Sequence, residues 1–354
     1  MIWIDIATPK YALFFSRLIP LLDKEVLVTT RYSKEYSEAK EILDKFKIEH
    51  YVLGNYGGKD KKDKFLARLK RSKEFIELFE KVGYPKLLIN GAVVDSTQTA
   101  FGLGIKNIIF YDTPVAMEAN YQKISYDLTP VSKLTLPFAD VVYYPFILPK
   151  EIYEKSCIKN AISYGFIDVC LWMDFKRDKK RDFRKKFNIP TTKPTILIRE
   201  EEYKAHYVKE KKFFIYDLIR ELKNENFNIV IIPRYESSYL KKEFPFAYVI
   251  DEKLKPEEFY PFIDLFIGAG GTMTLEAVYY GIPTISMRSI WLIHDKYLID
   301  NDLMFWTNST KEALRYIKKN IGKKFDNKRF FCKEKCSLED IALQIKEFYE
   351  ANSL

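Results

Sequence analysis

The residues that could do chemistry lie most densely in segment 261–287, which reads PFIDLFIGAGGTMTLEAVYYGIPTISM. A short apolar run is followed by a loop and a helix start made of Gly268, Gly270, Gly271, Thr272 and Met273. Glycines let the backbone approach a bound group, and the free N–H groups at a helix start favour an anion. The segment therefore predicts a strand, a glycine loop and a helix with an anion site. A tight turn in which glycine only relieves steric strain has the same spacing.

Three charged residues in the same half of the chain suit the same ligand. Arg199 and Arg234 each follow an apolar run that predicts a strand, and a strand-end arginine can pair with a phosphate. Glu276 lies four residues after Thr272 and therefore on the same face of the predicted helix. A carboxylate there can accept both hydroxyl protons of a ribose. The alternatives are a salt bridge from each arginine to a neighbouring acid, and an ordinary exposed position for Glu276.

The first half of the chain offers acid and base groups at the ends of predicted strands. The candidates are Asp5, Asp95, Asp112 and Glu118, with Thr8 in the loop after the first strand. Of the three histidines, His50 is expected inside a strand, whereas His206 lies in a polar loop after Arg199. The chain has no Ser/His/Asp order, no H-E-x-x-H pattern and no G-x-x-x-x-G-K-[ST]. Hydrolase, zinc-protease and P-loop interpretations therefore have little support.

The composition is typical of a globular protein with two domains. The chain has 354 residues, too many for one ordinary core, of which 47% are hydrophobic and 30% charged. No run of about 18 apolar residues occurs, and the start MIWIDIATPK lacks the order of a signal peptide, so we expect a cytoplasmic protein. The four cysteines are expected to be reduced and isolated. Cys332 and Cys336 lack the second pair that a zinc site needs, so no metal is expected.

Basic residues outnumber acidic residues by 58 to 49, which gives a formal net charge of +9. Such an excess attracts polyanions, anionic lipid surfaces or phosphorylated substrates. Much of it lies in residues 59–71, 176–186 and 318–335, where a solvated helix surface is the simpler interpretation. No nucleic-acid motif accompanies the charge, so nucleic acid is not an expected partner.

Apolar runs alternate with helical patterns through most of the chain. Strands are expected at residues 2–6, 25–30, 48–53, 86–90, 107–111 and 140–144, and again at 195–199, 228–233, 246–250, 264–268 and 304–306. This rhythm predicts an α/β protein with parallel sheets and right-handed crossovers. The predicted organisation is a Rossmann-like domain at 1–160, a connection at 161–193, a second Rossmann-like domain at 194–335 and a final helix at 336–354.

Segments along the whole chain also carry a resemblance. They read DIATPKYALFF, YGG, FYDTP, ISYGFIDVCLW, ILIREEEYKAHY, IIPRYE and GAGGTMTLEAVYYGIPTIS. With them the chain resembles an archaeal and bacterial family of predicted glycosyltransferases with the GT-B fold, in which two Rossmann-like domains face each other across a cleft. The same superfamily includes the UDP-N-acetylglucosamine 2-epimerases and glycosyltransferases that act on lipid-linked sugars.

The resemblance implies that the second domain binds a nucleotide-diphosphate sugar, which is a substrate and not a cofactor. The implied donor residues are Arg199, Arg234, Gly268, Gly270, Gly271, Thr272, Met273 and Glu276, and the implied acceptor side contains Thr8, Gly57, Gly58 and Asp112. Relatives often carry histidine where this chain has Thr8, and glutamate where it has Asp168. If that histidine is a base in relatives, this chain uses either a different reaction or another group, for which Asp112, Thr8 and Asp5 are the candidates.

The expected function is transfer of a sugar from a nucleotide-diphosphate sugar to an acceptor, with retention or inversion left open. The net positive charge suits an acceptor at an anionic membrane surface, such as a sugar linked to a polyprenyl phosphate, so peripheral association with the membrane is expected. A 2-epimerase is the second interpretation, although the sequence after Tyr111 reads DTPVAME and lacks the signature associated with those enzymes. A non-catalytic nucleotide-binding protein is the third.

Overall fold

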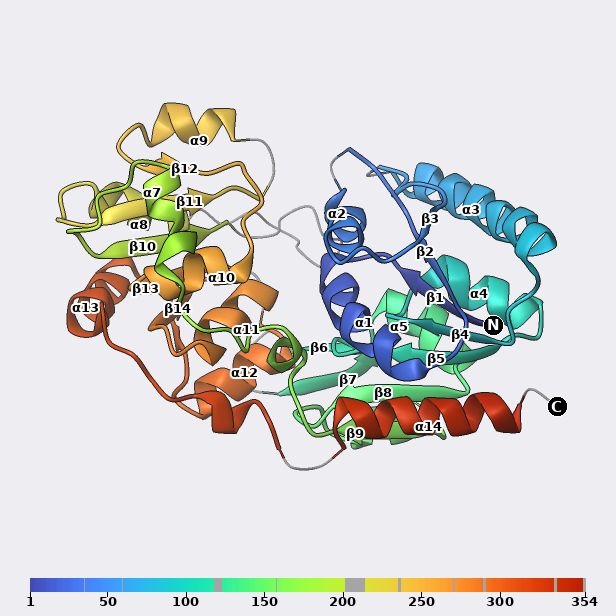
Figure 1. The fold of residues 1–354 in the computed structure, drawn as a ribbon. Helices are drawn as coiled ribbons and strands as arrows, with labels where there is room; N and C mark the ends of the chain where they lie inside the picture. The colour runs from blue at the N-terminus through green and yellow to red at the C-terminus, as the bar shows by residue number, and fades with distance from the viewer. Residues whose placement is uncertain are drawn as a thin grey trace. The chain divides into compact units, whose positions relative to one another are not determined.

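The computed structural model describes residues 1–34, 36–58, 60–117, 123–156, 158–200, 214–234, 237–269, 271–288, 291–333 and 336–352. The chain forms two compact units (Figure 1). The first unit contains Met1–Glu118, Lys123–Asp168 and Lys333–Leu354, and the second is built from Val169–Cys332. Each unit has a parallel sheet, so the predicted α/β fold with two parallel sheets is confirmed.

The sheet of the first unit has the strand order β3-β2-β1-β4-β5-β8-β9, and all its strands are parallel. The strands are β1 (Ile2–Ile6), β2 (Val26–Thr30), β3 (Tyr51–Val52), β4 (Leu87–Asn90), β5 (Lys106–Phe110), β8 (Val141–Pro145) and β9 (Ala161–Tyr164). All five residues of β1 are buried, because helices cover both faces of the sheet. An antiparallel hairpin that the sequence did not predict, β6 (Val115–Met117) with β7 (Ile124–Leu128), follows β5.

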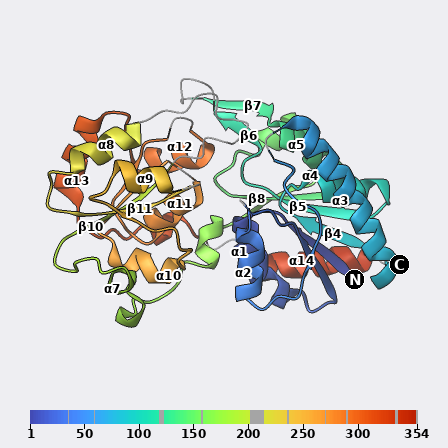
Figure 2. The same ribbon diagram turned by 90° about the horizontal axis from the view of Figure 1, so that it is seen from above.

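Two layers of helices cover the first sheet (Figure 2). One layer contains α3 (Lys61–Val82), α4 (Val94–Gly102) and α5 (Pro130–Thr135), and the other contains α1 (Pro9–Leu22), α2 (Glu38–Lys45) and α14 (Leu338–Ala351). Aromatic side chains anchor the first layer to β1, since the Trp3 ring lies 4.6 Å from Phe75 and 4.9 Å from Phe79 of α3, centroid to centroid. A short helix, α6 (Glu151–Lys155), links β8 to β9.

The structure divides the chain differently from the predicted ranges at two places. Residues 161–164, predicted to start a connection, form β9, which pairs with β8 through Val142 opposite Ala161. The final helix, α14, returns to the first unit, where it packs on α1. The amino-terminal ammonium donates a hydrogen bond to Tyr349 Oη at 2.6 Å, and Tyr143 Oη donates one to Gln344 Oε1 at 2.8 Å. The terminal helix therefore completes the first unit.

The sheet of the second unit is also parallel, with the order β12-β11-β10-β13-β14-β15. Its strands are β10 (Thr195–Arg199), β11 (Asn228–Ile232), β12 (Tyr248–Val249), β13 (Leu265–Gly268), β14 (Thr284–Ser286) and β15 (Phe305–Trp306). Its helices are α7 (Phe183–Lys186), α8 (Phe214–Leu222), α9 (Ser238–Glu243), α10 (Pro256–Phe259), α11 (Gly271–Tyr279), α12 (Ile293–Asp300) and α13 (Thr310–Asn320). Helices α8 and α13 lie side by side (Figure 2). Both contribute buried side chains to one apolar core with the strands.

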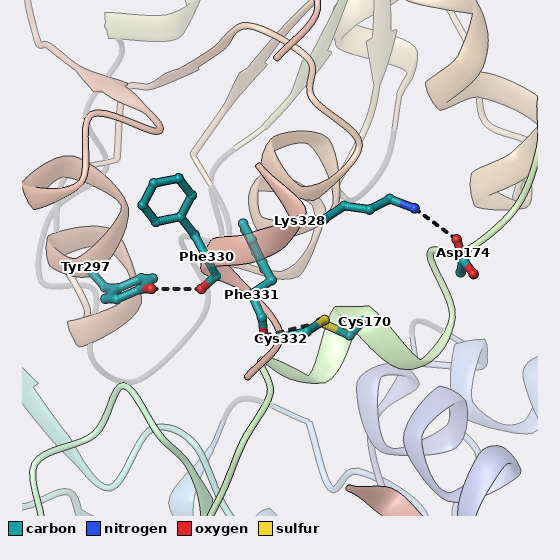
Figure 3. Close-up of a disulfide and its surroundings, with 7 residues drawn as sticks. All are labelled: Cys170, Asp174, Tyr297, Lys328, Phe330, Phe331 and Cys332. Atoms are coloured by element: carbon teal, nitrogen blue, oxygen red, sulfur yellow. Dashed lines mark hydrogen bonds and ion pairs between the residues drawn. A yellow bond between two sulfur atoms is a disulfide. The ribbon is translucent and has the colours of Figure 1, made fainter. Parts of the chain in front are cut away.

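A disulfide joins the two ends of the second unit (Figure 3). Cys170 lies in a short 3₁₀ helix, Asp168–Leu171, and pairs with Cys332, which is 162 residues away in the sequence. Lys328 beside it forms an ion pair with Asp174 at 2.9 Å. The prediction of reduced thiols is wrong for these two cysteines, because neither composition nor spacing reveals a pairing across so long a segment. Cys336 does not take part in this disulfide.

Candidate functional site

The strand order of the second unit selects one edge of its sheet for binding. Connections run in opposite directions from β10 and β13, which are neighbours, and ligands of doubly wound sheets bind at the strand carboxyl ends where this reversal occurs. Arg199 ends β10, Gly268 ends β13, and the two residues are direct partners in the parallel pairing. The sheet therefore brings the predicted arginine and the start of the predicted glycine loop to the same point.

Gly268 and Gly271 of the predicted loop differ in what surrounds them. A Cβ at Gly268 would lie 2.5 Å from the Phe266 ring and 2.9 Å from Thr274 Oγ1, so internal packing alone requires glycine there. A Cβ at Gly271 would meet nothing within 4 Å, and Gly271 is the first residue of α11. Open space thus adjoins the helix start, where N–H groups favour an anion. Thr272 and Met273 are half-buried in the first turn, and Gly270 lies outside the described residues.

Glu276 lies in the buried part of α11. Its exposed fraction is 4%, Trp172 Nε1 donates a hydrogen bond to Oε1 at 2.7 Å, and Tyr260 Oη donates one to Oε2 at 2.7 Å. Burial raises the pKa of the Glu276 carboxyl to about 7, although both hydrogen bonds act to lower it. The alternative of an ordinary exposed helix residue is therefore wrong. Each oxygen accepts one of these hydrogen bonds, and a carboxylate oxygen has a second acceptor site.

The two predicted arginines have different surroundings. Arg199 is half-buried, and its Nη1 donates to the carbonyl oxygens of Ile232 and Pro233. Its charge also acts on Tyr260. Burial and the nearby Glu276 raise the pKa of the Tyr260 phenol, and the charge of Arg199 partly lowers it. Arg234 is exposed, and its backbone N–H donates to Glu200 Oε2 at 2.9 Å.

Glu200, which follows Arg199 in the sequence, has hydrogen-bond partners in neighbouring elements of the second unit. Glu200 is buried and accepts hydrogen bonds from the hydroxyls of Tyr216 and Tyr239 as well as from the backbone of Arg234. Those contacts tie β10 to α8, to α9 and to the end of β11. Glu200 is thus a structural acid at the sheet edge.

A charged cluster lies at the carboxyl edge of the first sheet. Lys10, in the first turn of α1, places Nζ 2.6 Å from Asp112 Oδ2 and 2.6 Å from Asp168 Oδ2. Tyr164 Oη donates a hydrogen bond to Asp168 Oδ1 at 2.6 Å. Burial lowers the pKa of Lys10, but the two carboxylates more than offset it and the pKa is raised. Lys10 is therefore a charged ammonium that holds two carboxylates together.

Two phenols lie next to this charged cluster. The hydroxyls of Tyr11 and Tyr153 are buried, and neither has a hydrogen-bond partner among the described residues. Burial, with the nearby charge of Asp112, raises the pKa of both phenols well above its usual value. The cluster thus combines carboxylates, an ammonium and neutral phenols, which together can accept and donate protons. The sequence predicted Asp112 but missed Lys10, which lies in the segment DIATPKYALFF.

The other predicted catalytic residues are placed differently. Thr8 is exposed and precedes α1, as its N-cap residue without a side-chain cap. Asp5 is fully buried and accepts hydrogen bonds from Arg71 Nη2 at 2.6 Å, Arg71 Nη1 at 3.0 Å and Thr29 Oγ1 at 2.7 Å. Arg71 also lies 3.3 Å from Asp95 Oδ2. This network gives Asp5 and Asp95 a structural role in place of the predicted catalytic one, because the arginine occupies their oxygens away from solvent.

The acceptor-side glycines have a structural explanation as well. Gly57 and Gly58 have φ angles of +78° and +75°, which favour glycine. A Cβ at Gly57 would lie 2.7 Å from Lys64 Cα of α3, so packing against that helix requires glycine, whereas the space at Gly58 is open. The predicted candidates Glu118 and His206 lie outside the described residues.

A family model with the description "Protein of unknown function (DUF354)" matches residues 1–341. The chain belongs to this family. It is 29% identical over 331 residues to the protein MJ0665 of Methanocaldococcus jannaschii. This match covers 91% of this chain and 92% of MJ0665. MJ0665 carries the description "uncharacterized protein". Family membership therefore supports the predicted relationship without naming a reaction.

Solved structures share the fold of this DUF354 member. The UDP-GlcNAc 2-epimerase from Neisseria meningitidis, bound to UDP-GlcNAc, matches 99% of each chain with a TM-score of 0.73 at 14% identity. The spinosyn rhamnosyltransferase SpnG matches 98% of this chain and 96% of its own with a TM-score of 0.57 at 11% identity. At these identities the similarity shows the GT-B fold, in agreement with the prediction. Among the helices of the described ranges, none is long and apolar enough to cross a bilayer.

Proposed function

We propose that the protein is a glycosyltransferase that moves a sugar from a nucleotide-diphosphate sugar to an acceptor hydroxyl. The observation that carries the proposal is the sheet edge of the second unit. There Arg199 lies opposite Gly268 at the reversal of the strand order, and α11 begins with open space at Gly271. A positive guanidinium and free helix N–H groups together suit a diphosphate.

The donor would be oriented by α11. In the proposed complex the diphosphate accepts hydrogen bonds from the backbone at Gly271 and Thr272, and Glu276 one turn later accepts the ribose hydroxyls. Trp172 and Tyr260 would act as positioning residues, because each fixes one oxygen of the Glu276 carboxylate at 2.7 Å. Arg234, exposed after β11, would supply further positive charge for the phosphates.

The proposed reaction needs one base and stabilisation of one leaving group. The acceptor oxygen forms a bond to the anomeric carbon, the bond from that carbon to the diphosphate breaks, and the acceptor proton moves to Asp112. The negative charge that develops on the leaving diphosphate is stabilised by Arg199 and the start of α11. Lys10 would hold Asp112 as a carboxylate, since its charged Nζ lies 2.6 Å from Oδ2.

Epimerisation at the sugar C2 is a second candidate function, and the charged cluster of the first unit favours it. That chemistry removes a proton from C2, eliminates the nucleoside diphosphate, then adds both back with the proton on the opposite face. It needs acids and bases together, and Lys10, Asp112 and Asp168 with the phenols of Tyr11 and Tyr153 offer both. A non-catalytic nucleotide-binding protein would use the sheet edge of the second unit alone.

Turnover with and without acceptor separates these functions. The purified protein would be incubated with a panel of nucleotide sugars, alone and with a membrane lipid extract that contains polyprenyl-phosphate-linked sugars. Release of nucleoside diphosphate only with the extract supports transfer to a lipid-linked acceptor. A changed sugar without acceptor supports epimerisation, and binding without any turnover would contradict both enzymatic proposals.

The binding site itself is tested with two variants. Arg199→Met is expected to weaken binding of a nucleoside diphosphate such as UDP by about tenfold or more, because a charge-assisted contact is lost. Arg315→Met is the matched control, since Arg315 is exposed on α13 of the same unit. Equal affinity of both variants in calorimetric titration would contradict the proposed diphosphate site.

A further inference from the structure

The amino-terminal half of α3 is an exposed helix segment with unusual side chains. Within residues 61–70 no residue is buried, whereas the second half of the helix buries Arg71, Phe75, Leu78 and Phe79. Three large apolar residues of this segment are nevertheless open to solvent. Phe65, Leu66 and Leu69 have exposed fractions of 50%, 52% and 49%. Single exposed apolar side chains are ordinary, but a contiguous group of three indicates an interaction surface.

The three side chains share one face of the helix. At 3.6 residues per turn, Phe65, Leu69 and Leu66 span an arc of about 100°. The centre of that arc lies roughly 150° from the centre of the arc that contains the buried residues Arg71 and Phe75. The apolar face therefore points away from the core of the first unit, so the sheet on which α3 packs does not cover it.

Lys62 lies within this apolar face and Lys61 and Lys70 lie beside it, whereas Lys64 lies on the opposite side of the helix, against Tyr56 and the loop at Gly57. Residues 61–70 contain five basic residues and one acidic residue, Asp63, a net charge of +4. Within the described ranges, Lys61, Lys62, Lys64 and Arg68 form no ion pair with an acid, so their charge is not neutralised internally. Apolar side chains beside unneutralised lysine and arginine are typical of helices that lie in the interface of an anionic bilayer.

The segment is held as a helix before any partner binds. The Asp60 side chain caps the helix by accepting hydrogen bonds from the backbone N–H groups of Lys62 at 2.7 Å and Asp63 at 3.3 Å. The loop at Gly57 packs directly against Lys64 and Ala67. An ordered helix presents its apolar face without a folding cost on binding.

We propose that residues 61–70 of α3 form a docking surface for an anionic lipid bilayer. Phe65, Leu66 and Leu69 enter the boundary between headgroups and acyl chains, and the basic residues contact the acidic headgroups. A second copy of this chain fits the surface poorly, because two segments of charge +4 repel each other at contact distance. The inference goes beyond the proposed function and does not depend on it, since vesicle binding is measured without turnover.

Co-sedimentation of the full-length protein with vesicles tests the proposal. One set of vesicles contains phosphatidylcholine alone, and the other contains equal parts of phosphatidylcholine and phosphatidylglycerol. The protein is expected to bind the anionic vesicles, and binding should weaken as salt is raised. Equal binding to both sets, or binding to neither, would overturn the proposal.

Variants then locate the surface. Phe65→Ser combined with Leu66→Ser and Leu69→Ser is expected to weaken vesicle binding by about tenfold or more. The control is Leu343→Ser, because Leu343 of α14 is 56% exposed on the same unit. An effect of the same size from Leu343→Ser, or none from the triple variant, would overturn the assignment. The assignment would also be overturned if the wild type were a dimer in sedimentation velocity and the triple variant a monomer. The surface would then be a contact between copies of the chain.

A charge variant checks the basic residues and keeps the fold. Lys61→Glu with Lys62→Glu reverses charge in the first turn of α3, where acidic residues favour a helix. Loss of vesicle binding with unchanged thermal unfolding is expected, and retained binding would overturn the electrostatic part of the proposal. Glu276→Ala should bind vesicles like the wild type, which separates failure here from failure of the proposed function.

Discussion

At the scale of single residues, Glu276 links burial to ligand binding. Its carboxyl has a pKa of about 7, raised by burial, and hydroxyl donors from a ribose would favour the charged form. Binding should therefore release a proton below neutral pH. Affinity for UDP is expected to increase about tenfold from pH 6 to pH 8, because the charged fraction of a group with this pKa increases by that factor.

Calorimetric titration at several pH values, in buffers of different ionisation enthalpy, measures both the affinity and the proton release. The Glu276→Gln variant should lose most of the pH dependence, whereas Glu221→Gln, an exposed glutamate of α8, should keep it. A wild-type affinity that is constant over this range would contradict the role assigned to Glu276.

The same carboxyl affects stability in a defined direction. Its pKa in the folded protein lies above the ordinary value of 4.5, so the folded state binds more protons between pH about 4.5 and about 7. The stabilisation from this group is present below pH about 4.5 and is lost as the pH rises through about 7. The buried carboxylate is therefore retained at some cost to stability, as is common for groups that serve a ligand site.

At the scale of elements, Arg71 connects helix α3 to strand β1. It is fully buried, with its guanidinium on the carboxylates of Asp5 and Asp95. Arg71→Met should lower the free energy of unfolding by about 3–5 kcal/mol, because two buried carboxylates lose their counter-ion. Denaturant unfolding measures the change, with the exposed Lys73→Met as control. A change below about 1 kcal/mol would show that water or another group replaces the arginine.

The elements that the sequence predicted best are strands buried on both faces. Four of the five residues of strand β1 are apolar, with Asp5 the exception, and its boundaries at residues 2 and 6 were predicted. Strand β7 was missed because it is half-exposed and carries polar residues at alternate positions, and β9 because its four residues include only one large aliphatic side chain. Short strands at a sheet edge owe their pairing to neighbours, which local sequence does not contain.

At the scale of the whole molecule, sequence predicts which strand ends share an edge but not which side chains meet there. Parallel strands end on one side of a sheet, so the predicted strand ends at Arg199 and Gly268 share an edge, and in the structure the two residues pair directly. Trp172 and Glu276 are 104 residues apart in the sequence, and Lys10 is more than 100 residues from both Asp112 and Asp168. Such contacts depend on the packing of loops from different strands, for which no periodicity exists in the sequence.

Substitutions in the two units should affect different steps, donor binding in the second unit and proton transfer in the first. Asp112→Asn in the first unit removes the proposed base and should reduce turnover of a nucleotide sugar by about 10²–10⁴-fold, while the affinity for UDP stays unchanged. Arg199→Met in the second unit should weaken UDP binding and shrink the thermal stabilisation that UDP gives the wild type. Turnover assays and thermal unfolding with UDP measure the two effects. If Asp112→Asn weakened UDP binding as much as Arg199→Met, the donor site would not belong to the second unit alone. If Asp112→Asn left turnover intact, the base would lie elsewhere, with Asp168, also paired with Lys10, the next candidate.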